Sequence, residues 1–155
     1  MNCLQELLNP QRALCQIQGG SRKRIFEVVA DALAREQEGL HTTELVAGML
    51  AREKLGSTAL GEGIAIPHCR LADCETAAGV LITLCTPADF ESPDGDDVDL
   101  IFALVVPADA TQEHLNLLAD IARLFSQEDL RDALRACRTS EALYTTAINW
   151  EQRGA

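Results

Sequence analysis

Hydrophobic residues recur at helical spacing in two segments of the first third of the chain. The first segment is typical of an amphipathic helix, with polar residues on its other faces and an apolar stripe of Ile25, Val28, Val29, Ala32 and Leu33. Ser21 is placed to cap this helix, after a glycine-containing loop. The second segment predicts a helix that opens at Thr42 and ends at Gly56, where a C-cap belongs. A short helix is also expected at residues 4–8.

The middle of the chain carries three apolar runs with β character. Residues 64–66 form a short run that Pro67 ends, because proline cannot donate to a strand ladder. Residues 80–85 and 98–106 are nearly continuous in apolar residues, as strands are when both of their faces are covered. These two runs are predicted to be central strands. The segment between them contains the turn-forming tetrapeptide at residues 92–95.

The last third of the chain is predicted to be helical throughout. Its apolar stripes are Leu115, Leu118, Ala122 and Phe125, then Leu130, Ala133, Leu134 and Cys137, and finally Leu143, Tyr144, Ala147 and Ile148. Ser126 and Ser140 are the expected N-caps. No repeat or linker interrupts the order of helices, strands and helices. The predicted fold class is therefore α/β, a sandwich of a small mixed β-sheet of about five strands covered by helices on both faces.

The size and charge of the chain narrow its class. A length of 155 residues suits one core better than two, so one domain over residues 1–155 is expected. The formal net charge of -11 opposes binding to nucleic acid and to anionic membranes. The start lacks a secretory signal, and the longest apolar run, residues 100–106, is too short to span a bilayer. We expect a cytoplasmic protein without membrane insertion, whose cysteines (Cys3, Cys15, Cys69, Cys74, Cys85 and Cys137) are reduced thiols.

The three histidines are the first candidates for chemistry, because an imidazole titrates near neutral pH. His68 follows Pro67, whose fixed φ would present the ring from a stiff strand end, as suits a nucleophile. His114 falls in the first turn of the helix expected after the segment 106–111, where free backbone N–H groups favour an anion. A histidine held at a strand end and a surface histidine near a helix start are the structural alternatives. His41 has no neighbours that suggest a function.

Other chemistries fit the sequence poorly. The glycine-containing loop at residues 56–63 lacks the Gly-Lys-Ser/Thr of a P-loop and the spacing of a dinucleotide fingerprint. The acids between residues 94 and 99 do not have the spacing of a calcium loop. His68, Cys69 and Cys74 could ligate zinc, but no second pair would close a tetrahedral site. A thiol enzyme built on Cys69 and His114 lacks any sign of an activated cysteine.

The segment around His68 has a specific family resemblance. The sequence of residues 51–71, AREKLGSTALGEGIAIPHCRL, resembles the signature of the enzyme IIA domains of the fructose/mannitol class in the bacterial phosphoenolpyruvate-dependent phosphotransferase system. The similarity is greatest to the nitrogen-regulatory branch. It continues through residues 98–108 and 113–115 and covers nearly the whole chain.

This resemblance implies roles for five residues. His68, in the Pro-His motif, would be the phosphorylation site, and His114, which opens the later helix, would assist it. Arg52 would stabilise the phosphate, which suits a guanidinium because its fork can hold two phosphate oxygens. Ser57 and Thr58 would line the same pocket. The residue after the active histidine is commonly Gly or Ala in the family and is a cysteine here, which leaves the chemistry of the ring intact.

The resemblance also implies partners and a mode of action. The donor would be an HPr-like phosphocarrier protein phosphorylated on histidine, and the phosphorylation state would signal to targets such as sensor kinases or potassium transporters. No cofactor, metal or nucleotide would be required. Two alternatives stay open: a sugar-specific IIA component of a fructose/mannitol transport system, and a non-catalytic binding regulator of kinases or transporters.

Overall fold

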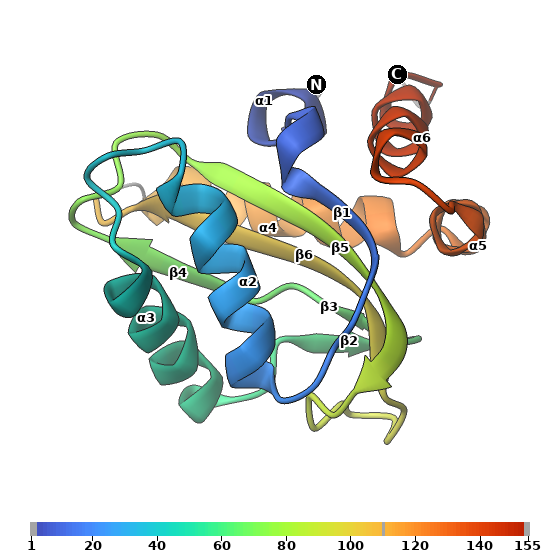
Figure 1. The fold of residues 1–155 in the computed structure, drawn as a ribbon, viewed down its shortest axis with the longest axis horizontal. Helices are drawn as coiled ribbons and strands as arrows, with labels where there is room; N and C mark the ends of the chain where they lie inside the picture. Colours follow the sequence, from blue (N-terminus) through green and yellow to red (C-terminus); the bar gives the residue numbers. More distant parts are fainter. Residues whose placement is uncertain (1–2, 110, 154–155) are drawn as a thin grey trace.

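The fold is a mixed sheet covered by helices, seen in a computed structural model that describes residues 3–109 and 111–153 (Figure 1). The helices are α1 (Cys3–Leu7), the 3-10 turn η1 (Pro10–Arg12), α2 (Arg22–Ala34), α3 (Thr42–Leu55), α4 (Thr111–Phe125), α5 (Glu128–Ala136) and α6 (Ser140–Arg153). The strands are β1 (Ala13–Ile17), β2 (Ala59–Gly61), β3 (Ile64–Ala65), β4 (His68–Leu71), β5 (Ala78–Ala88) and β6 (Val98–Pro107). The predicted α/β class is confirmed.

The sheet is organised around β6. Its order is β1-β5-β6-β3-β2, and β4 also pairs with β6. β5 runs antiparallel to β6, whereas β3 and β4 both run parallel to it. Ala65 is opposite Ile101 and His68 is opposite Leu104, so β3 and β4 follow one another along the same edge of β6. The sheet is therefore mixed, as predicted.

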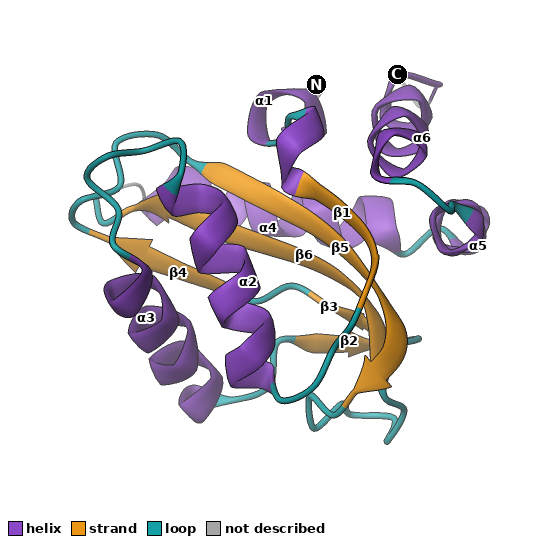
Figure 2. Ribbon diagram, in the orientation of Figure 1, coloured by secondary structure: helices purple, strands orange, loops and turns teal. Residues whose placement is uncertain are grey.

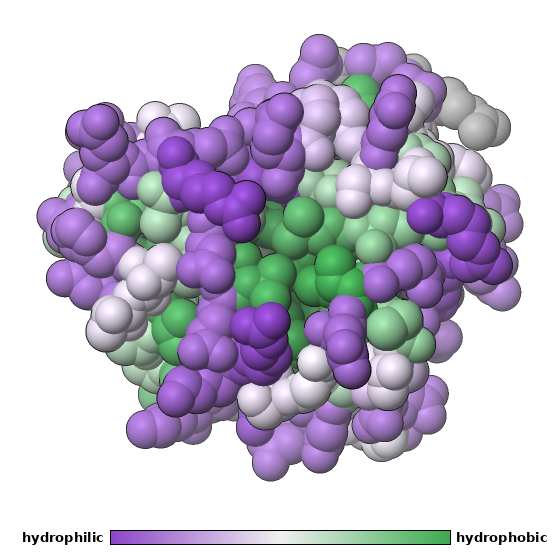
Figure 3. All heavy atoms as spheres, in the orientation of Figure 1, coloured by the Kyte–Doolittle hydropathy of each residue, from purple (hydrophilic) through white to green (hydrophobic). Residues whose placement is uncertain are grey.

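Both faces of the two central strands are buried, as their unbroken apolar sequences predicted. Alternate residues of β6 enter different hydrophobic clusters: Ile101 and Ala103 lie in one, Leu100 and Phe102 in the other. The first cluster packs under α2 and α3, and the second under α1, α4, α5 and α6. Figure 2 shows α2 and α3 on one face of the sheet and α4 across the other. Figure 3 shows apolar side chains at the surface beside α2, within a polar surround.

The strands that the sequence analysis missed are short or lie at an edge. β1 and β2 fall in segments that were expected to be loops, and β4 falls in a segment for which no strand was predicted. β1 has β5 as its partner and is mostly half-buried, so its sequence lacks the continuous apolar run of a central strand. β2 and β4 have only three and four residues, too few for a periodic pattern.

The residues that cap the helices agree with the predictions in part. Ser21 caps α2, since its side chain accepts a hydrogen bond from the Arg24 N–H, and Gly56 caps the end of α3 with a φ of 153°. The predicted caps at Ser126 and Ser140 are wrong. The Ser126 hydroxyl instead donates to a carbonyl of the preceding helix, and the residue before α5 makes no side-chain cap. Thr139 accepts from the backbone of α6 in place of Ser140, because α6 begins at Ser140, one residue earlier than a Ser140 cap requires.

The acidic segment between β5 and β6 forms a turn. The Gly95 N–H donates to the Ser92 carbonyl over 3.0 Å, and Gly95 has a φ of 80°. The Asp94 carboxylate accepts from Glu62 and Asp96 N–H groups and from the Ser92 hydroxyl, and these hydrogen bonds lower its pKa. Within residues 3–109 and 111–153, no group of His, Cys, Asp and Glu is arranged to hold a metal ion. In the same residues, no helix is both long enough and apolar enough to cross a membrane.

The close approach of β5 and β6 gives a first prediction. A Cβ added at Gly79 would lie 2.5 Å from Cζ of Phe102, whose ring is buried in the second cluster. Gly79→Ala should therefore lower the free energy of unfolding by about 1–3 kcal/mol, as overpacked core substitutions do. Chemical denaturation measures this change.

A second substitution tests whether the Phe102 ring is the cause. Phe102→Leu removes the clashing atoms, so the double variant Gly79→Ala/Phe102→Leu should be more stable than the sum of the single effects predicts. Strict additivity would show that the ring does not limit this position.

Candidate functional site

The backbone around His68 is held by strand pairing on both sides of Pro67. The Ile66 N–H donates to the Thr58 carbonyl over 3.1 Å, and the Leu104 N–H donates to the Pro67 carbonyl over 2.9 Å. His68 is the first residue of β4, whereas the sequence analysis expected it to follow a strand end. The break between β3 and β4 thus places His68 on a rigid part of the sheet, with its side chain half-buried.

The two ring nitrogens of His68 have different hydrogen bonds. Nδ1 lies 2.8 Å from the Ile66 carbonyl oxygen, and a carbonyl oxygen can only accept. Nδ1 therefore carries the proton. Nε2 lies 3.2 Å from Nε of Arg52, which can only donate. The lone pair of the neutral ring is consequently on Nε2.

The surroundings of His68 favour its neutral form. Burial is the largest cause that lowers its pKa below the ordinary value of 6.5, and the positive charge of Arg52 lowers it further. The Ile66 carbonyl and the negative charge of Glu53 act in the opposite direction but do not cancel the effect. At neutral pH the ring is therefore mostly uncharged, as a nucleophile must be.

His68 lies in a cavity of about 340 Å³ that also contains three of the other predicted site residues. Arg52, Ser57 and Thr58 line it together with Ala59, Leu60, Ile66, Leu118, Ala119 and Ala122. His114 belongs to α4, whose later residues line the cavity, but the side chain of His114 lies outside the described residues. The structure thus brings Arg52, Ser57, Thr58 and His68 together.

The two hydroxyl groups of the loop after α3 point into the protein. Ser57 donates to the Phe90 carbonyl and also accepts from the Ala59 N–H, and Thr58 donates to the Glu53 carboxylate. Both hydroxyl groups therefore donate their hydrogens to acceptors within the protein. The loop therefore shapes the wall of the cavity, and Arg52 supplies its positive charge.

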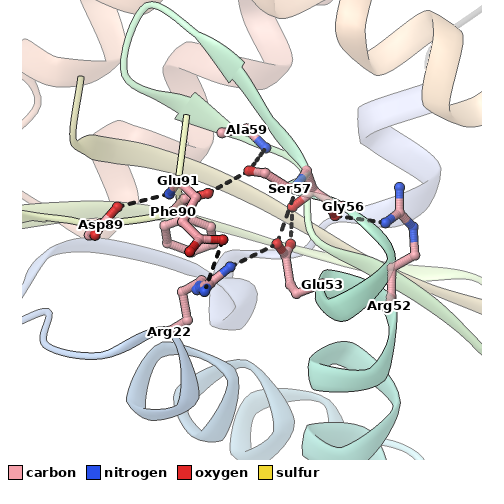
Figure 4. A network of polar contacts seen from close by, with 10 residues as sticks. Arg22, Arg52, Glu53, Gly56, Ser57, Ala59, Asp89, Phe90 and Glu91 are labelled. Carbon is pink, nitrogen blue, oxygen red and sulfur yellow. Dashed lines mark hydrogen bonds and ion pairs between the residues drawn. The ribbon is translucent and has the colours of Figure 1, made fainter. Parts of the chain in front are cut away.

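Sequence reasoning missed two charged residues beside this loop. The Glu53 side chain is buried and accepts from the backbone N–H and the hydroxyl of Thr58, and Arg22 of α2 contacts it across 3.4 Å (Figure 4). A signal was present, because Glu53 shares the buried face of α3 with Leu45 and Met49. A carboxylate at helical spacing with core residues predicts a buried polar network.

The cysteines near the site are unsuited to catalysis. Burial raises the pKa of Cys69 to about 12, so its thiol stays protonated at neutral pH. Burial also raises the pKa of Cys74. Among the residues whose side chains the structure describes, the five cysteines are all free thiols, as expected: Cys15, Cys69, Cys74, Cys85 and Cys137. This argues against the alternative of a thiol enzyme built on Cys69.

The environment of His68 predicts its titration. NMR titration of the ring should give a midpoint below 6.5, and Arg52→Ala should raise that midpoint because a neighbouring cation is removed. The ring ¹⁵N shifts of the neutral form should report a protonated Nδ1 and an unprotonated Nε2. An unchanged or lower midpoint in Arg52→Ala would contradict the proposed electrostatic contact.

Comparisons with known proteins identify the family. A sequence model of the family described as "Phosphoenolpyruvate-dependent sugar phosphotransferase system, EIIA 2" matches residues 6–149. A nitrogen regulatory protein of Pseudomonas aeruginosa is 45% identical over 146 residues, which cover 94% of this chain and 95% of that protein.

Solved structures agree with the sequence comparisons. The crystal structure of the nitrogen regulatory protein IIA-Ntr from Neisseria meningitidis has a TM-score of 0.85 and 40% identity, and the match covers 92% of this chain and 97% of that chain. The IIA mannitol structure from Escherichia coli, at 19% identity, shares the fold with a TM-score of 0.75 over 90% of this chain and 98% of that chain. As the resemblance of residues 51–71 predicted, the chain belongs to the EIIA 2 family of the phosphoenolpyruvate-dependent phosphotransferase system and has nitrogen regulatory proteins among its relatives.

Proposed function

We propose that this chain is a phosphocarrier and regulator that accepts a phosphoryl group on Nε2 of His68. The observation that carries this proposal is the neutral ring of His68 with its lone pair on Nε2, 3.2 Å from the Arg52 guanidinium at a cavity wall. Membership of a phosphotransferase family adds support. The match over residues 6–149 is consistent with one phosphocarrier domain.

The proposed reaction is an in-line transfer between two imidazoles. Nε2 of His68 attacks the phosphorus of a phosphohistidine on an HPr-like carrier protein, a new P–N bond forms, and the donor's P–N bond breaks with its electron pair returning to the donor ring. The donor ring leaves as a neutral imidazole when its other nitrogen carries a proton, and His68 keeps its own proton on Nδ1. The positive charge thus passes from the donor ring to the acceptor ring, and no other base is needed. Because both species are phosphoramidates, the transfer is close to balanced and reversible.

Arg52 has two successive roles in this mechanism. Before transfer its guanidinium donates to Nε2, so it must release that nitrogen when the phosphorus arrives. The guanidinium then holds equatorial oxygens, where its fork matches the phosphoryl group. We place His114 as an assisting group because it lies near the start of α4, and Ser57 and Thr58 as parts of the pocket wall.

The surface around the cavity suits a protein donor. Among the described residues, the exposed large hydrophobic side chains are those of Leu55, Leu60 and Leu115. Leu60 lines the cavity, Leu55 lies three residues after Arg52 on α3, and Leu115 is one helical turn before Leu118 on α4. Apolar side chains that surround a reactive group are typical of a macromolecular docking surface. The acidic net charge of the chain would attract a basic carrier.

Phosphorylation would convert this surface into a switch. A phosphoryl group adds about -1.5 to -2 charges at neutral pH, which changes the proteins that can dock beside it. Nitrogen regulatory relatives support a regulatory role. The targets that we propose, sensor kinases or potassium transporters, follow from the family resemblance alone, and the proposed location is the cytoplasm. Measuring target binding by wild type and by His68→Ala, each with and without phosphorylation, distinguishes a phosphorylation switch from binding that does not depend on phosphate.

A sugar-specific IIA role is the alternative function, and it would require onward transfer of the phosphoryl group to a IIB protein.

Phosphorylation of His68 can be tested directly. Incubation with phosphoenolpyruvate, enzyme I and an HPr-like carrier should add one acid-labile phosphoryl group, located on His68 by mass spectrometry. His68→Ala should abolish it, and Arg52→Ala should slow it by about 100- to 1,000-fold, as the loss of one transition-state donor does. The initial rate should also fall as the pH drops below the pKa of His68, because the protonated ring has no lone pair. Acid-stable phosphate, or labelling that survives in His68→Ala, would disprove the proposal.

The docking surface gives a separate prediction. Leu55 is 84% exposed, so Leu55→Ser should leave the fold intact. It should raise the KM for the donor protein by about 3- to 10-fold, since part of a leucine is buried on docking, with kcat unchanged. Leu55→Met, which retains the apolar surface, is the matched control. A KM equal to that of wild type in Leu55→Ser would exclude this edge of the cavity from the docking surface.

A further inference from the structure

A buried carboxylate is an unexpected neighbour for a site that binds phosphate. Glu53 is 7% exposed and follows Arg52 directly in α3, and its charge acts on His68. A negative charge here repels an incoming dianion, so its presence needs another explanation. Arg22 offsets much of the cost of burying this charge, because it contacts the Glu53 carboxylate across 3.4 Å.

The hydrogen bonds of Glu53 indicate what the carboxylate does. Oε1 accepts from the Thr58 hydroxyl, and Oε2 accepts from the Thr58 N–H and from Arg22. Both oxygens are thus used to connect the end of α3, the loop that follows it and the start of α2. In Figure 4 the carboxylate faces this loop, and Arg22 approaches it from the side of α2.

The same loop holds Arg52. The Gly56 carbonyl accepts a hydrogen bond of 2.9 Å from Nη1 of Arg52, while Nε of Arg52 donates to Nε2 of His68. Hydrogen bonds and the backbone of residues 56–58 therefore connect Glu53 to Arg52 and to the ring of His68. A second tie fixes the loop from its other side, because Ser57 donates to the Phe90 carbonyl.

From this arrangement we infer that Glu53 is a positioning residue for phosphoryl transfer: its carboxylate locks the loop at residues 56–58 so that the Gly56 carbonyl aims the Arg52 guanidinium at Nε2 of His68. Glu53 is not among the residues that line the cavity and acts through Arg52. The inference rests on the proposed function of His68. A carboxylate is suited to the task because both of its oxygens accept, whereas the amide of a glutamine has only one accepting oxygen.

The test is a double-mutant cycle on the rate of phosphoryl transfer from the donor carrier. Glu53→Gln keeps the shape but loses one acceptor and the ion pair with Arg22. It should lower kcat by about 10- to 100-fold with little change in KM, as misplacement of a catalytic group does. In the Arg52→Ala background the same substitution should lower kcat by less than about 3-fold, because the group that it positions is absent.

Alternative results have distinct meanings. A loss of the same size in both backgrounds would overturn the inference, because Glu53 would then act independently of Arg52. A wild-type rate in Glu53→Gln would also overturn it. Failure of wild-type protein to accept phosphate at all would instead refute the proposed function of His68.

Two further sets of variants guard against general destabilisation. Thr58→Val removes the hydroxyl that Glu53 holds, whereas Thr58→Ser keeps it, so kcat of Thr58→Ser should exceed that of Thr58→Val. Equal values would contradict the inference. Glu36→Gln is the matched control, because the Glu36 carboxylate also forms an ion pair with an arginine and accepts from a second side chain but belongs to neither the loop nor the cavity. A similar fall in kcat in Glu36→Gln would mean that loss of any such ion pair slows transfer, and would overturn the specific role of Glu53.

Discussion

The parallel pairing of two successive short strands with one edge of β6 determines where the ring of His68 lies. β3 ends at Ala65, β4 begins at His68, and both keep their register with β6 across the gap. Pro67 has no backbone N–H to donate at this gap, but its carbonyl still accepts a hydrogen bond from the Leu104 N–H. The ring is therefore carried by β4, which is paired with a strand that is buried along most of its length, and this pairing limits the movement of His68 relative to α3 and α4.

Because His68 is held rigidly, its hydrogen bonds and its burial fix the tautomer and the charge of its ring. The Ile66 carbonyl selects the tautomer of His68, and burial together with Arg52 keeps the ring neutral. Arg52 is itself fixed by the Gly56 carbonyl. A small set of neutral and charged contacts thus sets both the protonation of the His68 ring and the position of the cation beside it.

Sequence reasoning succeeded where one physical signal dominated. Burial of both faces gave β5 and β6 their unbroken apolar runs, and the motif around His68 indicated the family and brought Arg52 to attention. Edge pairing and very short strands leave no such signal, so β1 and β4 were missed. Glu53 was missed for a different reason. Its partners come from α2 and from the loop after α3, and only the folded chain brings these segments together.

The hydrogen bonds of the His68 ring also affect whether trace metal ions can bind to it. An exposed histidine with an open nitrogen is a common ligand for zinc and copper ions. Here Nδ1 is hydrogen-bonded to the Ile66 carbonyl, and Nε2 is hydrogen-bonded to the Arg52 guanidinium. A metal ion would have to displace this guanidinium, whose positive charge repels it. A phosphoryl group, being anionic, is attracted by that same cation. The resting ring therefore discriminates by charge between the phosphoryl group that we propose it accepts and the trace metals that would block it.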